Sequence, residues 1–221
     1  MSLQKNWEEK ELGELTEILM GQSPPSKDYN VEGNGIPFFQ GKADFGKKHP
    51  TPNQWCSKPI RVAKKRDILL SVRAPVGPVN MAMEDCCIGR GLSAIRANKN
   101  LDSNYLYFFM KINEEKLEAK GSGSTFKAIN RKEIEKIKIP VPPLSVQKQI
   151  VSILERAEGL KEKREQANEL TAQLAQSTFL EMFGDPLSNE MNWPLKRLRD
   201  VTISHDNKRV PVKASERENT K

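Results

Sequence analysis

The chain has 221 residues, of which 37% are hydrophobic and 29% charged, and its formal net charge is +7. This composition supports one domain core of ordinary size, so part of the chain is expected in an extended, solvated element. No apolar stretch is long enough to span a bilayer, the polar N-terminus does not resemble a secretory signal, and three cysteines make no disulfide framework. We therefore expect a reduced, cytoplasmic protein.

Residues 1–140 are predicted to form a globular domain of mixed α and β elements. Short strands are expected at residues 36–40, 67–73, 79–83, 91–96 and 137–139. Helices are expected at residues 8–19 (or a helix followed by a strand), 103–116 and 128–136. The strand at 67–73 is ended by Ala-Pro-Val-Gly, and we expect the next strand at 79–83 to pair with it.

The composition changes at Pro140, where a stiff Pro-Val-Pro-Pro linker begins. Ser145 is a good N-cap candidate. Residues 146–183 contain no proline, and Gly184 lies where a helix would end. At about 1.5 Å per residue, such a helix would be roughly 58 Å long. Residues 141–186 are thus assigned to the linker and one long helix.

One side of this helix carries a heptad seam. Its apolar positions are Ile150, Ile153, Ala157, Leu160, Ala167 and Leu174, and polar positions interrupt it at Arg164, Thr171 and Thr178. A solitary helix of this length must bury such a seam against another helix, and the polar positions favour one register. The alternative is a helix folded back on its own domain, which the prolines and the length disfavour.

Positive charge is concentrated in the globular part. Residues 34–75 hold nine basic and two acidic side chains, whereas residues 145–183 hold five basic and six acidic ones. A local positive excess beside a nearly neutral helix suggests a polyanion as the partner of the globular part. A solvated basic face is the alternative interpretation.

The opening of the chain returns near its end. The segments from Asn6 to Thr16 and from Asn192 to Thr202 share five of eleven residues without a gap. Unless the match is a coincidence, this repeat defines the unit of organisation. Residues 187–221 hold too few apolar side chains for a core, so we expect them to be the start of a second, truncated domain, partly disordered or covered by a neighbour.

The sequence shows no constellation that we assign to catalysis. The loop at Gly41 lacks the Ser or Thr of a P-loop, and residues 121–126 lack the third glycine of a dinucleotide fingerprint. The adjacent Cys86 and Cys87 fit buried thiols better than metal ligands. We therefore predict no active site, no metal and no cofactor.

Four longer motifs follow one another along the chain. They are Asp67-Ile-Leu-Leu-Ser-Val-Arg-Ala-Pro-Val-Gly-Pro-Val-Asn80, Cys87-Ile-Gly-Arg-Gly-Leu-Ser-Ala-Ile-Arg96, Gly123-Ser-Thr-Phe-Lys-Ala-Ile-Asn-Arg131 and Ile137-Lys-Ile-Pro-Val-Pro-Pro-Leu-Ser-Val-Gln-Lys-Gln-Ile150. In this order they resemble the DNA specificity (S) subunit of type I restriction–modification enzymes. The repeated opening motif is similar to the start of each target recognition domain in that family. Its members typically carry two such domains, each followed by a long helix, and the helices pack antiparallel and set the spacing of a split DNA site.

The resemblance implies a non-catalytic subunit that binds double-stranded DNA and positions methyltransferase (M) subunits and, through them, the restriction (R) subunit. The sequence stops shortly after the second motif copy, so we expect half a subunit: one α+β recognition domain and one spacer helix that forms an antiparallel coiled coil. Two chains would then associate head to tail as a homodimer on a palindromic split site.

The resemblance also implies phosphate contacts from Lys and Arg and base contacts from Arg, Lys, Gln or Asn. The side chains expected to reach DNA are Gln40, Lys42, Lys47, Lys48, His49, Arg73, Arg90, Lys120, Ser122, Ser124, Lys127 and Arg131. A structural role between strands is the alternative for Arg73 and Arg90, and solubility is the alternative for the lysines. Two rival classes stay open: a stand-alone DNA-modifying enzyme and a coiled-coil assembly protein without DNA affinity.

Overall fold

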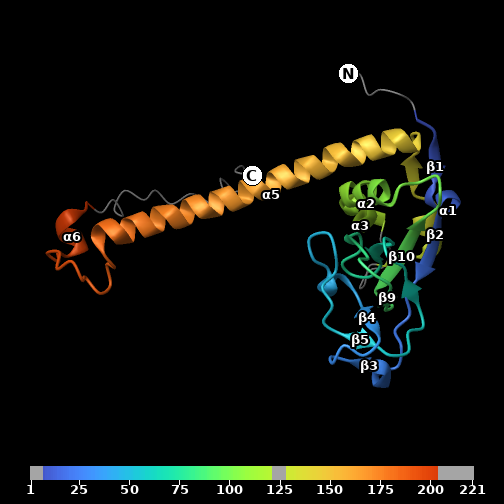
Figure 1. Ribbon diagram of the computed structural model, residues 1–221, viewed down its shortest axis with the longest axis horizontal. Coiled ribbons are helices and arrows are strands. Elements are labelled where there is room, and N and C mark those ends of the chain that lie inside the picture. Colours follow the sequence, from blue (N-terminus) through green and yellow to red (C-terminus); the bar gives the residue numbers. More distant parts are fainter. Residues whose placement is uncertain (1–6, 121–127, 204–221) are drawn as a thin grey trace, which may run out of the picture. The chain divides into compact units, whose positions relative to one another are not determined.

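The computed structural model describes residues 7–120 and 128–203 and separates into two units, Met1–Leu160 and Lys161–Lys221. The first unit, here called the head, is an α+β domain that includes the first turns of the long helix (Figure 1). Its boundary therefore lies 20 residues beyond the predicted one at residue 140, because the helix begins by packing on the head.

The strands are β1 (Glu9–Glu11), β2 (Thr16–Met20), β3 (Tyr29–Asn30), β4 (Ile36–Phe39), β5 (Trp55–Cys56), β6 (Val62–Ala63), β7 (Ile68–Ser71), β8 (Val79–Met81), β9 (Cys86–Ile88), β10 (Leu92–Ala97) and β11 (Lys138–Pro140). The helices are α1 (Leu12–Leu15), α2 (Ser103–Ile112), α3 (Glu114–Lys120), α4 (Arg131–Glu135), α5 (Leu144–Phe183) and α6 (Leu198–Val201), with 3-10 turns η1 (Ser26–Asp28) and η2 (Lys42–Asp44). Residues 9–20 thus form a strand, a short helix and a second strand. Of the two predictions for residues 8–19, the helix followed by a strand fits α1 and β2.

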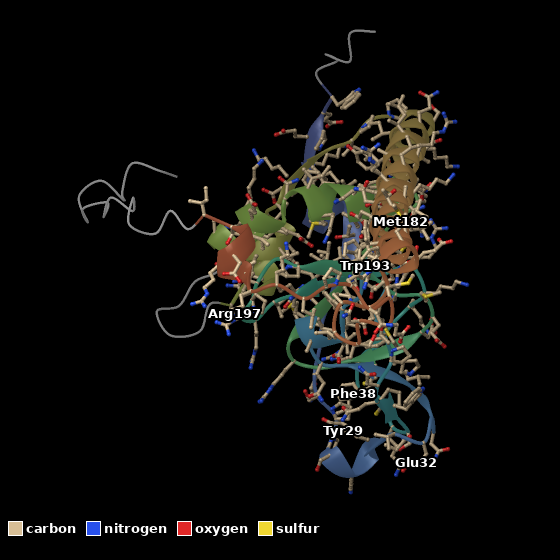
Figure 2. All side chains as sticks on the ribbon, turned by 90° about the vertical axis from the view of Figure 1, so that its left-hand side faces the viewer. Tyr29, Glu32, Phe38, Met182, Trp193 and Arg197 are labelled. Carbon is tan, nitrogen blue, oxygen red and sulfur yellow. The ribbon has the colours of Figure 1, made fainter. Side chains whose placement is uncertain are left out.

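Two sheets form the body of the head. A four-stranded antiparallel sheet has the order β2-β10-β7-β8, and a five-stranded sheet has the order β3-β5-β4-β9-β6. The predicted pairing of the strands at 67–73 and 79–83 is confirmed, since Ile68 lies opposite Met81. In the second sheet, Tyr29 and Phe38 pack with ring centroids 4.6 Å apart (Figure 2).

Alternating side chains of β7 enter two separate cores. Ile68 and Leu70 belong to the core beneath α2, whereas Leu69 belongs to a second cluster with β9 and β10. Asp102 caps α2 by accepting hydrogen bonds from the backbone of Asn104 and Tyr105. The predicted single helix at 103–116 is interrupted at Asn113, which separates α2 from α3.

The prediction of one long helix is confirmed by the 40 residues of α5, but Ser145 is not its N-cap. The helix begins at Leu144, directly after Pro143, so Ser145 lies inside the first turn. Gln147 and Val151 are buried against the head. The fold-back alternative thus holds for the first turns, whereas Leu160 and Leu174 are 68% and 65% exposed.

The second unit contains the C-terminal part of α5 and the second motif copy. The chain leaves α5 through Gly184, whose φ of 73° suits a residue without a Cβ, and the indole of Trp193 donates to the carbonyl of Phe183. The motif then forms α6. The predicted disorder concerns residues 187–221, of which 204–221 lie outside the described residues.

Candidate nucleic-acid interface

One parallel strand pair brings two polar segments to the same end of the five-stranded sheet, where both strands finish. Strands β4 and β9 run parallel, with Phe38 opposite Cys87 and Phe39 opposite Ile88. Their carboxyl ends therefore coincide, and the chain continues there into Gln40 and Arg90 respectively. Both side chains are exposed.

Two glycines allow these segments to touch. A Cβ added at Gly91 would lie 2.3 Å from the carbonyl oxygen of Gln40, and one added at Gly89 would lie 3.1 Å from the Gln40 Cα. Such contacts exclude any side chain at Gly91 unless the backbone shifts. The Gly-Arg-Gly sequence thus holds Arg90 directly beside the turn that follows β4.

That turn is fixed by one carboxylate. The Asp44 Oδ2 accepts hydrogen bonds from the backbone of Gln40 (2.6 Å) and Gly41 (3.2 Å). The Gln40 side-chain amide donates to the Gln54 Oε1 at 3.2 Å, so two amide groups lie side by side. Lys42 begins the 3-10 turn and is exposed. An exposed amide beside two cations offers both donors and acceptors to a base edge.

Arg73 joins the same edge from the other sheet. Strands β7 and β10 run antiparallel, and just beyond their paired residues the backbone N–H of Val72 donates to the carbonyl of Gly91 at 2.9 Å. Arg73 follows Val72 and Arg90 precedes Gly91, so these two arginines are neighbours. Arg73 also forms an isolated bridge with Ala128. Gln40, Lys42, Arg73 and Arg90 are named here the cationic edge; among the described residues, the side chains of Lys42, Arg73 and Arg90 form no ion pair.

Residues that the sequence did not suggest lie next to the cationic edge. Gln22 and Ser23 follow β2 and reach the same place, since Gln22 N–H donates to the Ile88 carbonyl (3.0 Å) and Arg90 N–H donates to the Ser23 hydroxyl oxygen (3.3 Å). Gln54 was missed as well. The available signal was a polar residue directly after or before a short strand, which is too common to single out one position.

Lys48 and His49 lie elsewhere, beside β8. The Lys48 ammonium lies 3.6 Å from a Glu155 carboxylate oxygen and 5.5 Å from the ring centre of Tyr107. His49 Nδ1 donates to the carbonyl of Met81, because a carbonyl can only accept. A phosphate would have to compete with these contacts for Lys48. Lys47 is exposed next to them.

The remaining predicted DNA ligands follow α3. Lys120 ends that helix, and its side chain, like Ser122, Ser124 and Lys127, falls outside the described residues. Arg131 opens α4, where its Nε donates to Glu135 at 2.7 Å, so its charge is balanced within one helical turn. The structure therefore brings four of the predicted side chains together at the cationic edge, whereas Lys48 and His49 lie beside β8 and Arg131 pairs with Glu135.

Other charges of the head are used within the fold. Arg96 forms a bidentate pair with the buried carboxylate of Asp67, at 3.0 and 2.9 Å, and this hydrogen bonding raises the pKa of Arg96. Lys64 donates to Asp85 at 2.7 Å and lowers the pKa of that carboxyl. These pairs join strands and turns, so the cations of Arg96 and Lys64 are held by carboxylates of the head.

The prediction that Cys86 and Cys87 are buried thiols is confirmed. Burial is the main cause that raises the pKa of each thiol to about 12, so both stay protonated at neutral pH. Among the described residues, no group of three His, Cys, Asp or Glu side chains is arranged to hold a metal ion. None of the described helices has the length and apolar character needed to cross a membrane.

A two-sheet head with a cationic edge, continued by one long helix, is the architecture of a DNA specificity module. The chain belongs to the type I restriction modification DNA specificity domain family, whose model matches residues 4–172. It is 46% identical over 168 residues to the putative type I restriction enzyme MjaX specificity subunit of Methanocaldococcus jannaschii, covering 75% of this chain and 40% of that protein.

Solved structures agree with this assignment. The HsdS subunit from Thermoanaerobacter tengcongensis is 46% identical, with a TM-score of 0.67 over 76% of this chain and 41% of that one. A chain from a study of complex assembly and conformational transition in a type I R-M system is also 46% identical, with a TM-score of 0.72 over 80% and 44% of the two chains. The present chain thus spans less than half the length of these relatives.

Proposed function

We propose that this chain is a DNA sequence-recognition subunit of a type I restriction–modification complex and catalyses no reaction itself. The observation that carries the proposal is the cationic edge on a head that belongs to the specificity-domain family. The chain would bind duplex DNA there and present it to methyltransferase (M) subunits and, through them, to a restriction (R) subunit, in the cytoplasm where these act.

Within the cationic edge, the chemistry of each side chain would decide whether it contacts a base or a phosphate. A guanidinium group matches the O6 and N7 acceptors of guanine, which favours Arg73 and Arg90 as base-reading residues. The paired amides of Gln40 and Gln54 present the donor and acceptor that match adenine. Lys42 suits a phosphate contact, which fixes register without reading sequence.

The other predicted ligands keep a lesser place in this proposal. Lys47 and His49 lie outside the cationic edge and would at most contact flanking phosphates. Lys48 and Arg131 would first have to leave Glu155 and Glu135. Four further predicted ligands stay predictions: Lys120, Ser122, Ser124 and Lys127. They are kept because they precede Ala128 in the chain, and Ala128 forms a bridge with Arg73.

The long helix would carry a second copy of the chain, antiparallel to the first. Support comes from its exposed apolar positions: Ile153, Leu160 and Leu174 are 62%, 68% and 65% exposed, and Ala157 and Ala167 continue the seam. Ile150 is not part of the proposed seam, because its side chain packs against the core of the head. Two heads related by two-fold symmetry would bind a palindromic split site. Sedimentation at micromolar concentration should then report a dimer, and a monomer would contradict this arrangement.

The test of DNA reading compares two exposed cations at opposite ends of β10. Arg90 precedes this strand at the cationic edge, and Lys99 follows its other end. We expect Arg90→Ala to weaken binding of a selected duplex by about 1–3 kcal/mol and to relax one base position. Lys99→Ala should bind as the unchanged protein does.

The measurement is fluorescence anisotropy with duplexes enriched from a randomised library, over a series of salt concentrations. Binding should weaken steeply with salt, because phosphate contacts release counterions. Failure to bind any duplex at low salt, alone or with the M partner, would instead favour a coiled-coil assembly protein. Methylation or cleavage of DNA by the purified chain alone would favour a stand-alone enzyme.

A further inference from the structure

Gln147, in the first turn of α5, is fully buried. Glutamine is rarely found in such a position unless all its polar atoms have partners. Here its Oε1 accepts from the backbone N–H of Asp102 at 2.8 Å, and its Nε2 donates to the carbonyls of Asn100 (3.1 Å) and Pro142 (2.8 Å). One side chain therefore binds three backbone groups in two segments, at residues 100–102 and at Pro142.

These partners permit one orientation of the amide. Two carbonyls face the nitrogen and one N–H faces the oxygen, so a rotated amide would lose all three bonds. Asp102 is also the N-cap of α2, whose position is set by the core beneath it. The Gln147 side chain therefore holds the start of α5 at a fixed position relative to α2.

The apolar contacts of α5 hold the helix against the head without defining its direction. Val151 is buried one turn after Gln147, and Ile150 and Leu154 pack against the same core. Burial of apolar surface is not directional, whereas a hydrogen bond weakens steeply when it is bent. A slight roll or tilt of the helix would keep most of the burial but break the amide bonds.

We propose that Gln147 is a positioning residue that fixes the direction in which α5 leaves the head and thereby the spacing between the two DNA half-sites. The inference deepens the proposed function and depends on it for the role of the spacing. A helix of 40 residues is about 60 Å long, so a small change of angle at its origin is amplified at its far end.

The first arm of the test measures the joint without DNA. Spin labels are attached at Lys99→Cys and Arg156→Cys, which are exposed and belong to the head, while the three native cysteines are fully buried. Gln147→Met keeps the side-chain length and removes the three bonds. Gln149→Met is the matched control, the same change at an exposed position two residues later. We expect one narrow distance distribution in the parent and the control and loss of that narrow peak in Gln147→Met.

The second arm measures the consequence for DNA. Each variant is used to select duplexes from a library with a long randomised segment. The parent and Gln149→Met should enrich two half-sites at one fixed spacing, and Gln147→Met should enrich the same half-sites with loss of the fixed spacing. A purely structural role would lower all enrichment together and leave the spacing unchanged. Should Gln147→Met not fold, Gln147→Glu, which keeps the acceptor and loses both donors, replaces it in both arms.

An unchanged distance distribution in a folded Gln147 variant would overturn the inference. A broadened distribution with an unchanged half-site spacing would overturn the positioning role as well. If the parent itself enriches no motif, the proposed function fails and with it the role of the spacing, while the distances still decide whether Gln147 fixes the helix direction.

Discussion

The two copies of the opening motif fold alike and are buried in opposite ways. In the first copy, α1 follows Glu11 (ψ 143°) and ends at Thr16 (φ −140°); in the second, α6 follows Arg197 (ψ 141°) and ends at Thr202 (φ −134°). In each, the threonine hydroxyl donates to the carbonyl four residues earlier, at 2.7 and 2.8 Å. The local sequence therefore suffices to set this backbone.

Burial depends on what surrounds the motif. Leu12 and Leu15 are 0% and 4% exposed because α1 packs on α4 within the head, whereas Leu198 and Val201 are 75% and 58% exposed. The comparison separates two contributions that are usually inseparable: the backbone conformation that a short motif prefers, and the free energy that its apolar side chains gain from a core.

The copies are not interchangeable. A Cβ added at Gly13, the eighth position of the motif, would lie 3.1 Å from the Glu135 Cβ, so a side chain there would press on α4 in the head. The second copy has Arg199 there, which is exposed and lies 3.6 Å from Asp200. A surface that buried the second copy as the head buries the first would have to accommodate a long cation at this position.

The largest contrast is expected for the first leucine of each copy. Leu12→Ala should lower the free energy of unfolding of the head by about 2–5 kcal/mol, because it leaves a cavity in a fully buried site. Leu198→Ala, the matched change, should alter it by less than about 0.5 kcal/mol. Urea denaturation followed by circular dichroism measures both.

Equal effects of the two substitutions would mean that Leu198 is buried in solution. Sedimentation of the Leu198→Ala protein would then distinguish a covering second copy of the chain, which should dissociate, from a contact within one chain.

Alkaline pH should weaken the head by a smaller amount. Burial raises the pKa of the Cys86 and Cys87 thiols from 9.0 to about 12, so the folded head keeps both protonated while the unfolded chain ionises above pH 9. Stability is thus complete below pH 9 and is lost progressively toward pH 12, by at most about 1.4 kcal/mol per thiol and pH unit.

The measurement is the urea midpoint of the head between neutral pH and pH 11. Cys86→Ala should flatten its dependence on pH, whatever it does to the midpoint at neutral pH. No described residue of the second unit is buried, so the effect belongs to the head. A midpoint that is independent of pH up to 11 would contradict the raised pKa values.

Several strands and the long helix were predictable because their signals are local, whereas the strands of two or three residues β1, β3, β5, β6 and β9 were not predicted. The run from Ile68 to Ser71 is apolar and bounded by turn residues, and α5 has no proline inside and Gly184 at its end. Ser145 was wrongly taken as the N-cap because the apolar Leu144 just ahead of it is already helical, directly after Pro143. Such an end depends on how the preceding strand enters the head.

The cationic edge was predictable in its residues but not in its extent. Arg73 and Arg90 carry a signal, a cation at the end of a predominantly apolar run, whereas Lys48 was suggested only by its place in a basic stretch and lies beside Glu155 of α5. That pairing joins residues more than a hundred positions apart, which no local pattern reports. Gln147 was hidden for the same reason, since its partner Asp102 belongs to a different element.

The smallest contrast concerns the threonine that ends each motif. Thr16→Val and Thr202→Val keep the side-chain shape and remove one hydroxyl bond, of 2.7 Å in the half-buried site and 2.8 Å in the exposed one. The first should cost about 1 kcal/mol, because the Leu12 carbonyl loses a partner where water has limited access. The second should cost at most a few tenths of a kcal/mol, since water replaces the hydroxyl.

Denaturation of the two variants under identical conditions measures the difference. Equal losses would show that the hydroxyl acts through the backbone preference that both copies share, and the contrast between the copies would then rest on their leucines alone.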